Sequence, residues 1–139
     1  MKKIILLFII TLSLTSFKNT SETDFNIVGK WEGQDNNEVG YLTFQKDSYA
    51  YFEINGQIIG GKEFEIKGKK GSMTYEVDFT AKPIQIDLII NIIGEKETHK
   101  LQGILEIITN DEIKVSLGFE GPRPTNFDTD ESLTFKRVE

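Results

Sequence analysis

From Ile27 onward, apolar and polar residues alternate with a period of two, and turn residues interrupt the alternation at short intervals. Such alternation predicts β-strands that bury one face and expose the other. The clearest example covers residues 72–79, where every second residue is apolar. The same pattern predicts strands over residues 41–46, 49–54, 57–59, 63–67, 84–93, 99–108, 112–119 and 132–138.

The residues between these segments are typical of tight turns. Asn55-Gly56 indicates a two-residue hairpin, because both central residues of that turn have positive φ. Gly60-Gly61 ends or bulges the following strand. No window beyond residue 20 shows a helical stripe, so we predict an all-β fold, a single antiparallel β-barrel of about eight to ten short strands. Ile89 lies on the polar side of its strand, which predicts that part of that outer face is covered.

The first twenty residues have the three parts of a secretory signal. Lys2 and Lys3 precede a short aliphatic core, residues 4–14, and small hydroxyl residues follow. The aliphatic core is shorter than the ~20 residues that span a bilayer. We therefore expect residues 1–20 to be a signal peptide, residues 21–26 a loose leader and residues 27–139 the barrel domain. The protein would be secreted or periplasmic. Without cysteine it cannot be a lipoprotein or carry disulfides.

The chain is acidic, and export would make it more so. Its formal charge of −6 becomes −9 without residues 1–20, whose only charges are three lysines. Phosphate backbones and anionic lipids require Lys or Arg to neutralise them. We therefore expect no nucleic-acid partner and no stable membrane insertion after signal cleavage.

The first and last predicted strands carry a glycine, a tryptophan and an arginine at informative positions. Gly29-Lys30-Trp31 forms a G-x-W on the first strand, and Arg137 lies on the last strand. This resembles the lipocalin arrangement, in which the Trp plugs the closed end and the Arg packs across its ring. The order of the later segments, including Arg123-Pro124, resembles a bacterial family of small lipocalin-like domains, abundant in planctomycetes, whose role is not established. The resemblance covers Ile27 to the C-terminus and implies a fold and a compartment.

Candidate catalytic chemistry is sparse. His99 is the only histidine, and no cysteine or H-x-x-E spacing accompanies it. We expect it to be a surface residue at the start of a strand. We predict no catalytic residues, no metal and no cofactor, and we interpret the protein as non-enzymatic.

Two charged residues leave alternatives open. Asp87 is either a binding or acid–base group, or a residue that faces outward or pairs with a Lys or Arg, which we favour. Arg123 either grips an anionic ligand or a partner carboxylate bidentately, or bonds loop carbonyls and shapes the barrel rim, which we favour. The proline that follows Arg123 restricts it to extended backbone angles.

These observations favour a monomeric binding protein. We expect a small apolar or amphipathic ligand in the barrel, and we name Phe44, Phe52, Tyr75 and Arg123 as candidate ligand-binding residues. An eight-stranded interior is either filled by side chains or open to one small molecule, and we expect a filled one. The alternative is a periplasmic inhibitor or immunity-type protein that binds a protein partner through rim loops such as residues 120–131.

Overall fold

The computed structural model describes residues 24–35, 37–96, 98–119 and 121–139. The expected signal peptide, residues 1–20, and most of the expected leader, residues 21–23, lie outside the described residues. Within the described part, no helix has the length and apolar character needed to cross a membrane.

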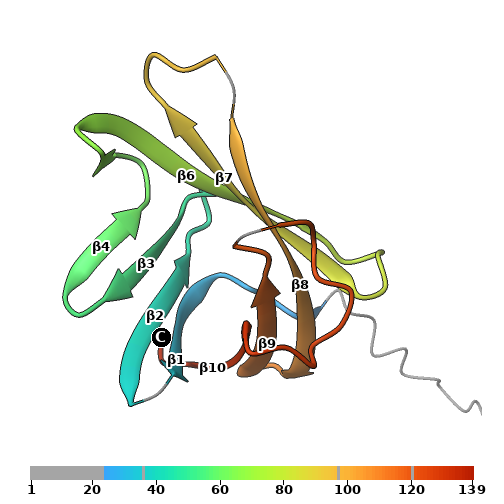
Figure 1. The fold of residues 1–139 in the computed structure, drawn as a ribbon. Coiled ribbons are helices and arrows are strands. Elements are labelled where there is room, and N and C mark those ends of the chain that lie inside the picture. Colours follow the sequence, from blue (N-terminus) through green and yellow to red (C-terminus); the bar gives the residue numbers. More distant parts are fainter. Residues whose placement is uncertain (1–23, 36, 97, 120) are drawn as a thin grey trace, which may run out of the picture.

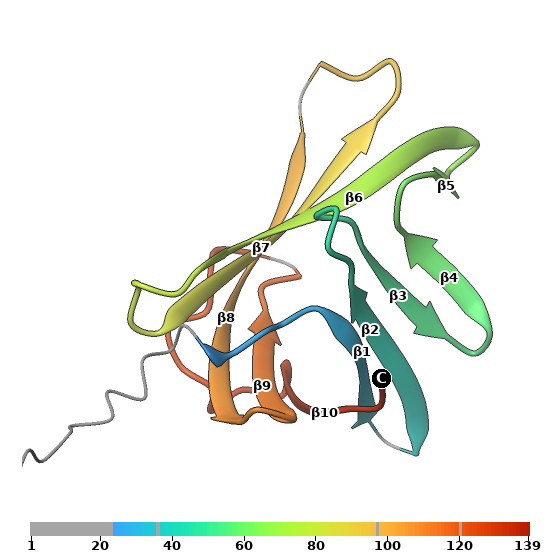
Figure 2. The ribbon, with the colours of Figure 1, turned by 180° about the vertical axis from the view of Figure 1, so that it is seen from behind.

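The described residues form ten antiparallel strands in one sheet, which confirms the prediction of a β-barrel. Along the sheet the order is β4-β3-β2-β1-β10-β9-β8-β7-β6-β5, so the first and last strands of the chain pair with each other. Figures 1 and 2 show the strands curving around a common interior. The strands are β1 (Gly29–Asp35), β2 (Glu38–Phe44), β3 (Ala50–Ile54), β4 (Gln57–Gly60), β5 (Phe64–Ile66), β6 (Lys69–Asp78), β7 (Ile84–Ile92), β8 (His99–Thr109), β9 (Glu112–Leu117) and β10 (Ser132–Arg137).

The barrel is nearly closed, along a seam where β4 meets β5 and β6. The amide of Met73 donates to the carbonyl of Gly61 at 2.8 Å, and the amide of Tyr75 donates to the carbonyl of Ser48 at 2.9 Å. The hydroxyl of Tyr75 also donates to the carbonyl of Gln45 at 2.9 Å. These bonds join β6 to residues that follow β2 and β4, and so blunt the sheet edges at the seam.

The turn chemistry read from the sequence is present. Asn55 and Gly56 have φ values of 52° and 79°, as a two-residue hairpin with two left-handed residues requires. Gly60 and Gly61, with φ values of 115° and 79°, end β4 and turn the chain toward β5.

Apolar side chains from almost every strand fill the centre of the barrel. Strand pairing fixes which residues face inward, because residues directly opposite each other point to the same side of the sheet. Trp31, opposite Leu42 and Arg137, therefore points inward and is fully buried. Its indole N–H donates to the carbonyl of Ile27 at 2.9 Å. The other buried members of this core are Ile27, Leu42, Phe44, Ala50, Met73, Ile86, Leu88, Leu105, Ile113, Val115, Leu117 and Phe135.

One end of the barrel is closed by Arg137. Its Cζ atom lies 4.2 Å from the centroid of the Trp31 ring. Its guanidinium donates to the carbonyls of Val28, Asn26 and Asn110 at 2.8, 2.6 and 2.8 Å. The Nε atom bonds the Asp111 carboxylate at 3.0 Å. Each nitrogen of the guanidinium therefore has a fixed acceptor, which holds the group over the indole.

Part of the outer face is also buried, as the apolar side chain of Ile89 led us to expect. Ile104 and Ser116 point outward, opposite each other on β8 and β9, yet they are 1% and 0% exposed. The segment between β9 and β10 runs around the outside of β8 (Figure 1). From this segment Thr129 lies 3.5 Å from the Ser116 hydroxyl, and Arg123 reaches Asp87 on β7.

Gly33 tests how tightly the core is packed. A Cβ atom at this position would lie 2.6 Å from the Phe135 ring, whereas one at Gly121 would meet nothing within 4 Å. We expect Gly33→Ala to lower the free energy of unfolding by about 1–3 kcal/mol through overpacking. Gly121→Ala is the matched control and should change it by less than about 0.5 kcal/mol. Urea unfolding measures both, and equal effects would contradict the packing argument.

Tyr75 makes the seam sensitive to alkaline pH. Burial raises its pKa above 10.0, and the Asp47 carboxylate raises it further. Because the pKa of Tyr75 is higher in the folded than in the unfolded state, its contribution to the free energy of unfolding is fully present below the unfolded-state pKa. That contribution is lost as the pH rises through the folded-state pKa. Tyr75→Phe should destabilise by about 1 kcal/mol at neutral pH, since it removes one hydrogen bond. The stability gap between the two proteins should narrow above about pH 10. A gap that stays constant from about pH 8 to pH 11 would refute this.

Candidate functional site

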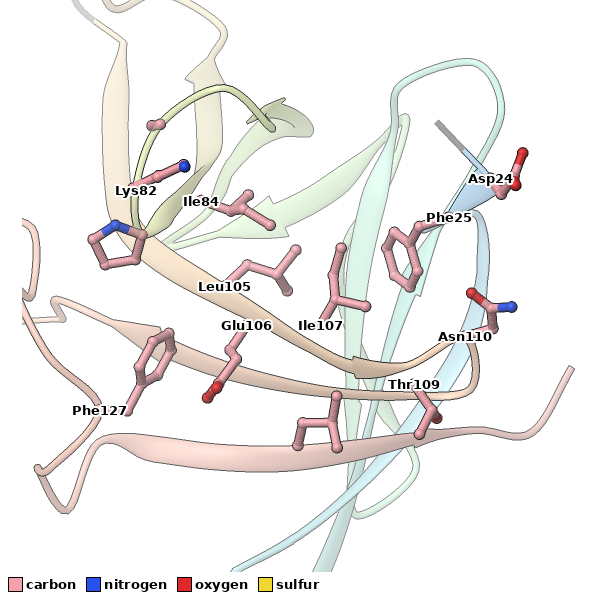
Figure 3. Close-up of a pocket in the computed structure, with 13 residues that line it drawn as sticks. Asp24, Phe25, Lys82, Ile84, Leu105, Glu106, Ile107, Thr109, Asn110 and Phe127 are labelled. Carbon is pink, nitrogen blue, oxygen red and sulfur yellow. The ribbon is translucent and has the colours of Figure 1, made fainter. Parts of the chain in front are cut away.

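A cleft of about 750 Å³ opens beside the second half of β8, and we call it the β8 cleft (Figure 3). It is lined by Asp24, Phe25, Ala81, Lys82, Pro83, Ile84, Leu105, Glu106, Ile107, Ile108, Thr109, Asn110 and Phe127.

The β8 cleft exists because β7 is shorter than β8. Pairing between them begins at Ile84, opposite Leu105, so β8 continues to Thr109 without β7 beside it. Pro83 precedes β7 and has no N–H to donate, so it cannot extend the ladder. The end of β8 therefore presents a strand edge to the cleft instead of to a neighbouring strand.

The floor of the β8 cleft is continuous with the barrel core. Phe25, Ile84 and Ile107 pack against the buried core residues, and they follow one another along the cleft in Figure 3. The Phe25 ring lies 6.2 Å from the rings of both Trp31 and Phe79. A molecule bound on this floor would therefore contact Phe25, whose ring lies beside the indole of the single tryptophan.

The walls of the β8 cleft are mixed in polarity. Phe127, from the segment between β9 and β10, forms the outer wall, and the Lys114 ammonium lies 5.8 Å from its ring centroid. Lys82 and Glu106 carry opposite charges on the rim. Asn110 lies at the far end, and its carbonyl is fixed by Arg137. An apolar floor with a few polar groups at the edge is typical of a small-molecule site.

A second cavity, of about 190 Å³, lies at the end of the inner face opposite Arg137, and we call it the mouth pocket. It lies between the hairpin of β1 and β2, the end of β3 and the start of β10. Its lining residues are Gly33, Asp35, Glu38, Val39, Gly40, Tyr41, Phe52, Ile54, Phe119, Leu133 and Phe135.

A third cavity, of about 340 Å³, lies between the turn after β5 and the turn after β7. Ile66, Ile90 and Ile92 form its apolar part. At its edge, His99 Nε2 lies 2.8 Å from Glu95 Oε2, and this hydrogen bond lowers the pKa of the Glu95 carboxyl. His99 is the first residue of β8 and its side chain is 58% exposed, so the expected surface position is confirmed.

The structure places the four candidate ligand-binding residues in three different regions. Phe44 and Tyr75 meet at the seam with ring centroids 4.8 Å apart, and Phe44 is fully buried. Phe52 lines the mouth pocket. Arg123 lies on the outer face. Gly29, Trp31 and Arg137 do come together, since a Cβ atom at Gly29 would lie 2.8 Å from the Arg137 guanidinium.

Asp87 and Arg123 form an ion pair on the outer face. Arg123 Nη1 lies 2.8 Å from Asp87 Oδ1, with side chains 20% and 18% exposed. The same nitrogen donates to the carbonyl of Gly103 at 2.7 Å. The preferred interpretation of Asp87 is therefore confirmed. Arg123 binds a carbonyl, as one of its alternatives stated, but this carbonyl belongs to a central strand and not to a loop.

Several residues of the two cavities were not among the sequence candidates. Pro83 and Phe127 come from connecting segments, where no period-two pattern marks an inward face. Phe119 was expected at the end of the strand over residues 112–119, but β9 ends at Leu117, so Phe119 also lies in a connecting segment. The useful signal would have been a large apolar residue within a loop, because such a residue is buried only where tertiary structure covers it.

Metal chemistry has no visible site in the described ranges, where no group of three or more His, Asp or Glu side chains is placed to hold an ion. The fold and the cavities define a small antiparallel β-barrel with a filled centre, one end closed by Arg137 and clefts that open to solvent. Comparisons with protein-family models, with curated proteins and with solved structures found no match for this chain.

The ion pair between Asp87 and Arg123 should be structural. Arg123→Ala leaves a mostly buried carboxylate without its cation, so we expect a loss of about 2–4 kcal/mol in the free energy of unfolding. The exposed pair of Lys70 and Glu63, with side chains 68% and 66% exposed, gives the control. Lys70→Ala should cost less than about 1 kcal/mol. Chemical unfolding of both variants measures this, and similar losses would show that burial does not matter here.

Proposed function

We propose that this chain is an exported, non-catalytic, lipocalin-like binding protein for a small apolar or amphipathic molecule, and that the β8 cleft is its binding site. The observation that carries the proposal is the cleft itself. Its volume of about 750 Å³ lies within the about 300–1,000 Å³ typical of ligand pockets. This moves the binding site from the centre of the barrel, where we first expected it, to its side.

The filled centre explains this shift. Phe44, Leu42 and Met73 are almost completely buried, and Phe44 packs edge-on against Tyr75. A ligand at their position would have to displace a close-packed core, which is costly. In the β8 cleft a ligand instead covers Phe25, Ile84 and Ile107, which are already partly open to water.

The charged side chains with candidate chemistry already have ion-pair partners, which supports binding over catalysis. Arg123 is committed to Asp87, and His99 to Glu95, both outside the β8 cleft. Within the cleft, Lys82 and Glu106 lie on the rim beside an apolar floor (Figure 3). Such groups orient the polar end of an amphipathic ligand without forming a nucleophile and base pair.

Export is supported by the sequence alone. The basic start, short aliphatic core and small residues of positions 1–20 are the parts of a signal peptide. Resemblance to the lipocalin-like family adds the expectation of an extracytoplasmic barrel.

The second candidate function is binding of a protein partner by the segment between β9 and β10. It is favoured by Phe119, which is 61% exposed although Arg123 anchors the same segment to β8. A large apolar side chain on a fixed loop is typical of an interface anchor.

The proposal is tested with the neutral dye N-phenyl-1-naphthylamine. Bound on the cleft floor, the dye should quench the fluorescence of Trp31 by accepting its excitation energy. The reason is proximity, because the Phe25 ring on that floor lies 6.2 Å from the indole. Phe127→Ala removes the outer wall and should weaken dye binding about tenfold, which equals about 1.4 kcal/mol. Ala81→Trp should block binding by filling the cleft, whereas Ala81→Ser should not change it.

Phe119→Ala is the matched control, because it removes an equally large ring from the mouth pocket. It should leave dye binding unchanged. Native mass spectrometry of the protein recovered from its own host would give the length of the exported chain and the mass of any retained molecule. If Phe119→Ala abolishes dye binding and Phe127→Ala does not, the β8 cleft is the wrong site. If neither variant matters and no small molecule is retained, the protein-partner function gains support.

A further inference from the structure

We propose that the mouth pocket is a separate binding site for a small organic cation, an ammonium group with compact apolar substituents. This site does not depend on the β8 cleft, since it is built from β1, β2, β3, β10 and Phe119.

The pocket exists because two glycines face each other on the inner side of the barrel. Gly33 of β1 lies directly opposite Gly40 of β2. The Phe135 ring covers Gly33, where a Cβ atom would come within 2.6 Å. Over Gly40, a Cβ atom would meet nothing closer than 3.7 Å. The missing side chain of Gly40 therefore leaves space above the Phe135 ring, and apolar atoms make up most of the wall.

Aromatic rings dominate that wall. Phe52 and Phe135 come from the inner faces of β3 and β10, opposite Leu42 and Ile113 respectively. Phe119 follows β9 and is 61% exposed, so its ring is available at the entrance. The faces of aromatic rings attract cations, and groups of such rings recognise ammonium ligands.

Two carboxylates stand at the lip of this aromatic pocket. Asp35 and Glu38 lie directly opposite each other in the hairpin of β1 and β2, on the same face as Gly33. Like charges in such a pair repel each other and destabilise the hairpin. None of the ion pairs formed among the described residues includes either carboxylate. A bound cation would relieve this repulsion, whereas an anionic amphiphile would add to it.

The size of the pocket restricts the ligand further. About 190 Å³ is below the range of pockets that hold drug-sized molecules, so it suits a compact group and not a long chain. The net charge of −6 favours the approach of cations over the whole surface, but only the mouth pocket combines two carboxylates with three phenylalanines among the cavities described above.

The test compares benzyltrimethylammonium with neopentylbenzene, its neutral isostere, by isothermal titration or by ligand-observed NMR. The cation should bind about five- to tenfold more tightly than the isostere, and the difference should shrink as salt rises from about 20 mM to about 300 mM. Asp35→Asn combined with Glu38→Gln should remove this preference while leaving the weak binding of the isostere unchanged. These substitutions keep the size of both side chains, and removing the repulsion should leave the fold at least as stable.

Two aromatic variants separate this site from the β8 cleft. Phe119→Ala should weaken binding of the cation about three- to tenfold, and Phe127→Ala should not affect it. For the dye the expected effects are reversed, since Phe127→Ala should weaken its binding and Phe119→Ala should not. The results can therefore contradict one proposed site without contradicting the other. Equal affinity for cation and isostere, a preference that survives the double variant, or no binding of the cation would each overturn the proposal.

Discussion

The packing of the Arg137 guanidinium against the Trp31 indole is the interaction on which the barrel depends most. It joins the last strand to the carbonyls of Asn26 and Val28, 111 and 109 residues earlier, and to the turn at Asn110 and Asp111. A chain without disulfides has no covalent means of closing so long a loop. Buried aromatic surface and a guanidinium that donates four hydrogen bonds perform this closure instead.

Arg137 closes one end of the barrel, and other regions of the barrel stay open. The ladder between β1 and β10 fixes Phe135 over Gly33, and from there the inner face widens into the mouth pocket. On the side of the barrel, β8 extends past the start of β7, and the β8 cleft lies beside this part of β8, which has no pairing with β7. Both cavities are thus consequences of strand length and residue size at the margins of one core of closely packed, buried side chains.

The segment between β9 and β10 links these features. Arg123 anchors it to Gly103 and Asp87, so it covers Ile104 and Ser116 on the outer face. From this anchored segment Phe127 turns to the β8 cleft and Phe119 to the mouth pocket. One ion pair therefore supports one wall of each proposed site, and a loop fixed by a rigid scaffold is a common place for binding residues.

The sequence by itself determined the strands, their turns and the closed shape. Period-two alternation and the positive-φ pair Asn55-Gly56 are local signals, and local signals need no knowledge of distant residues. The partner of Asp87, the space over Gly40 and the positions of Phe119 and Phe127 were decided only in the tertiary structure. Those features depend on which strands lie opposite one another, where each ladder stops and which loop covers which face, and one-dimensional alternation carries none of that information.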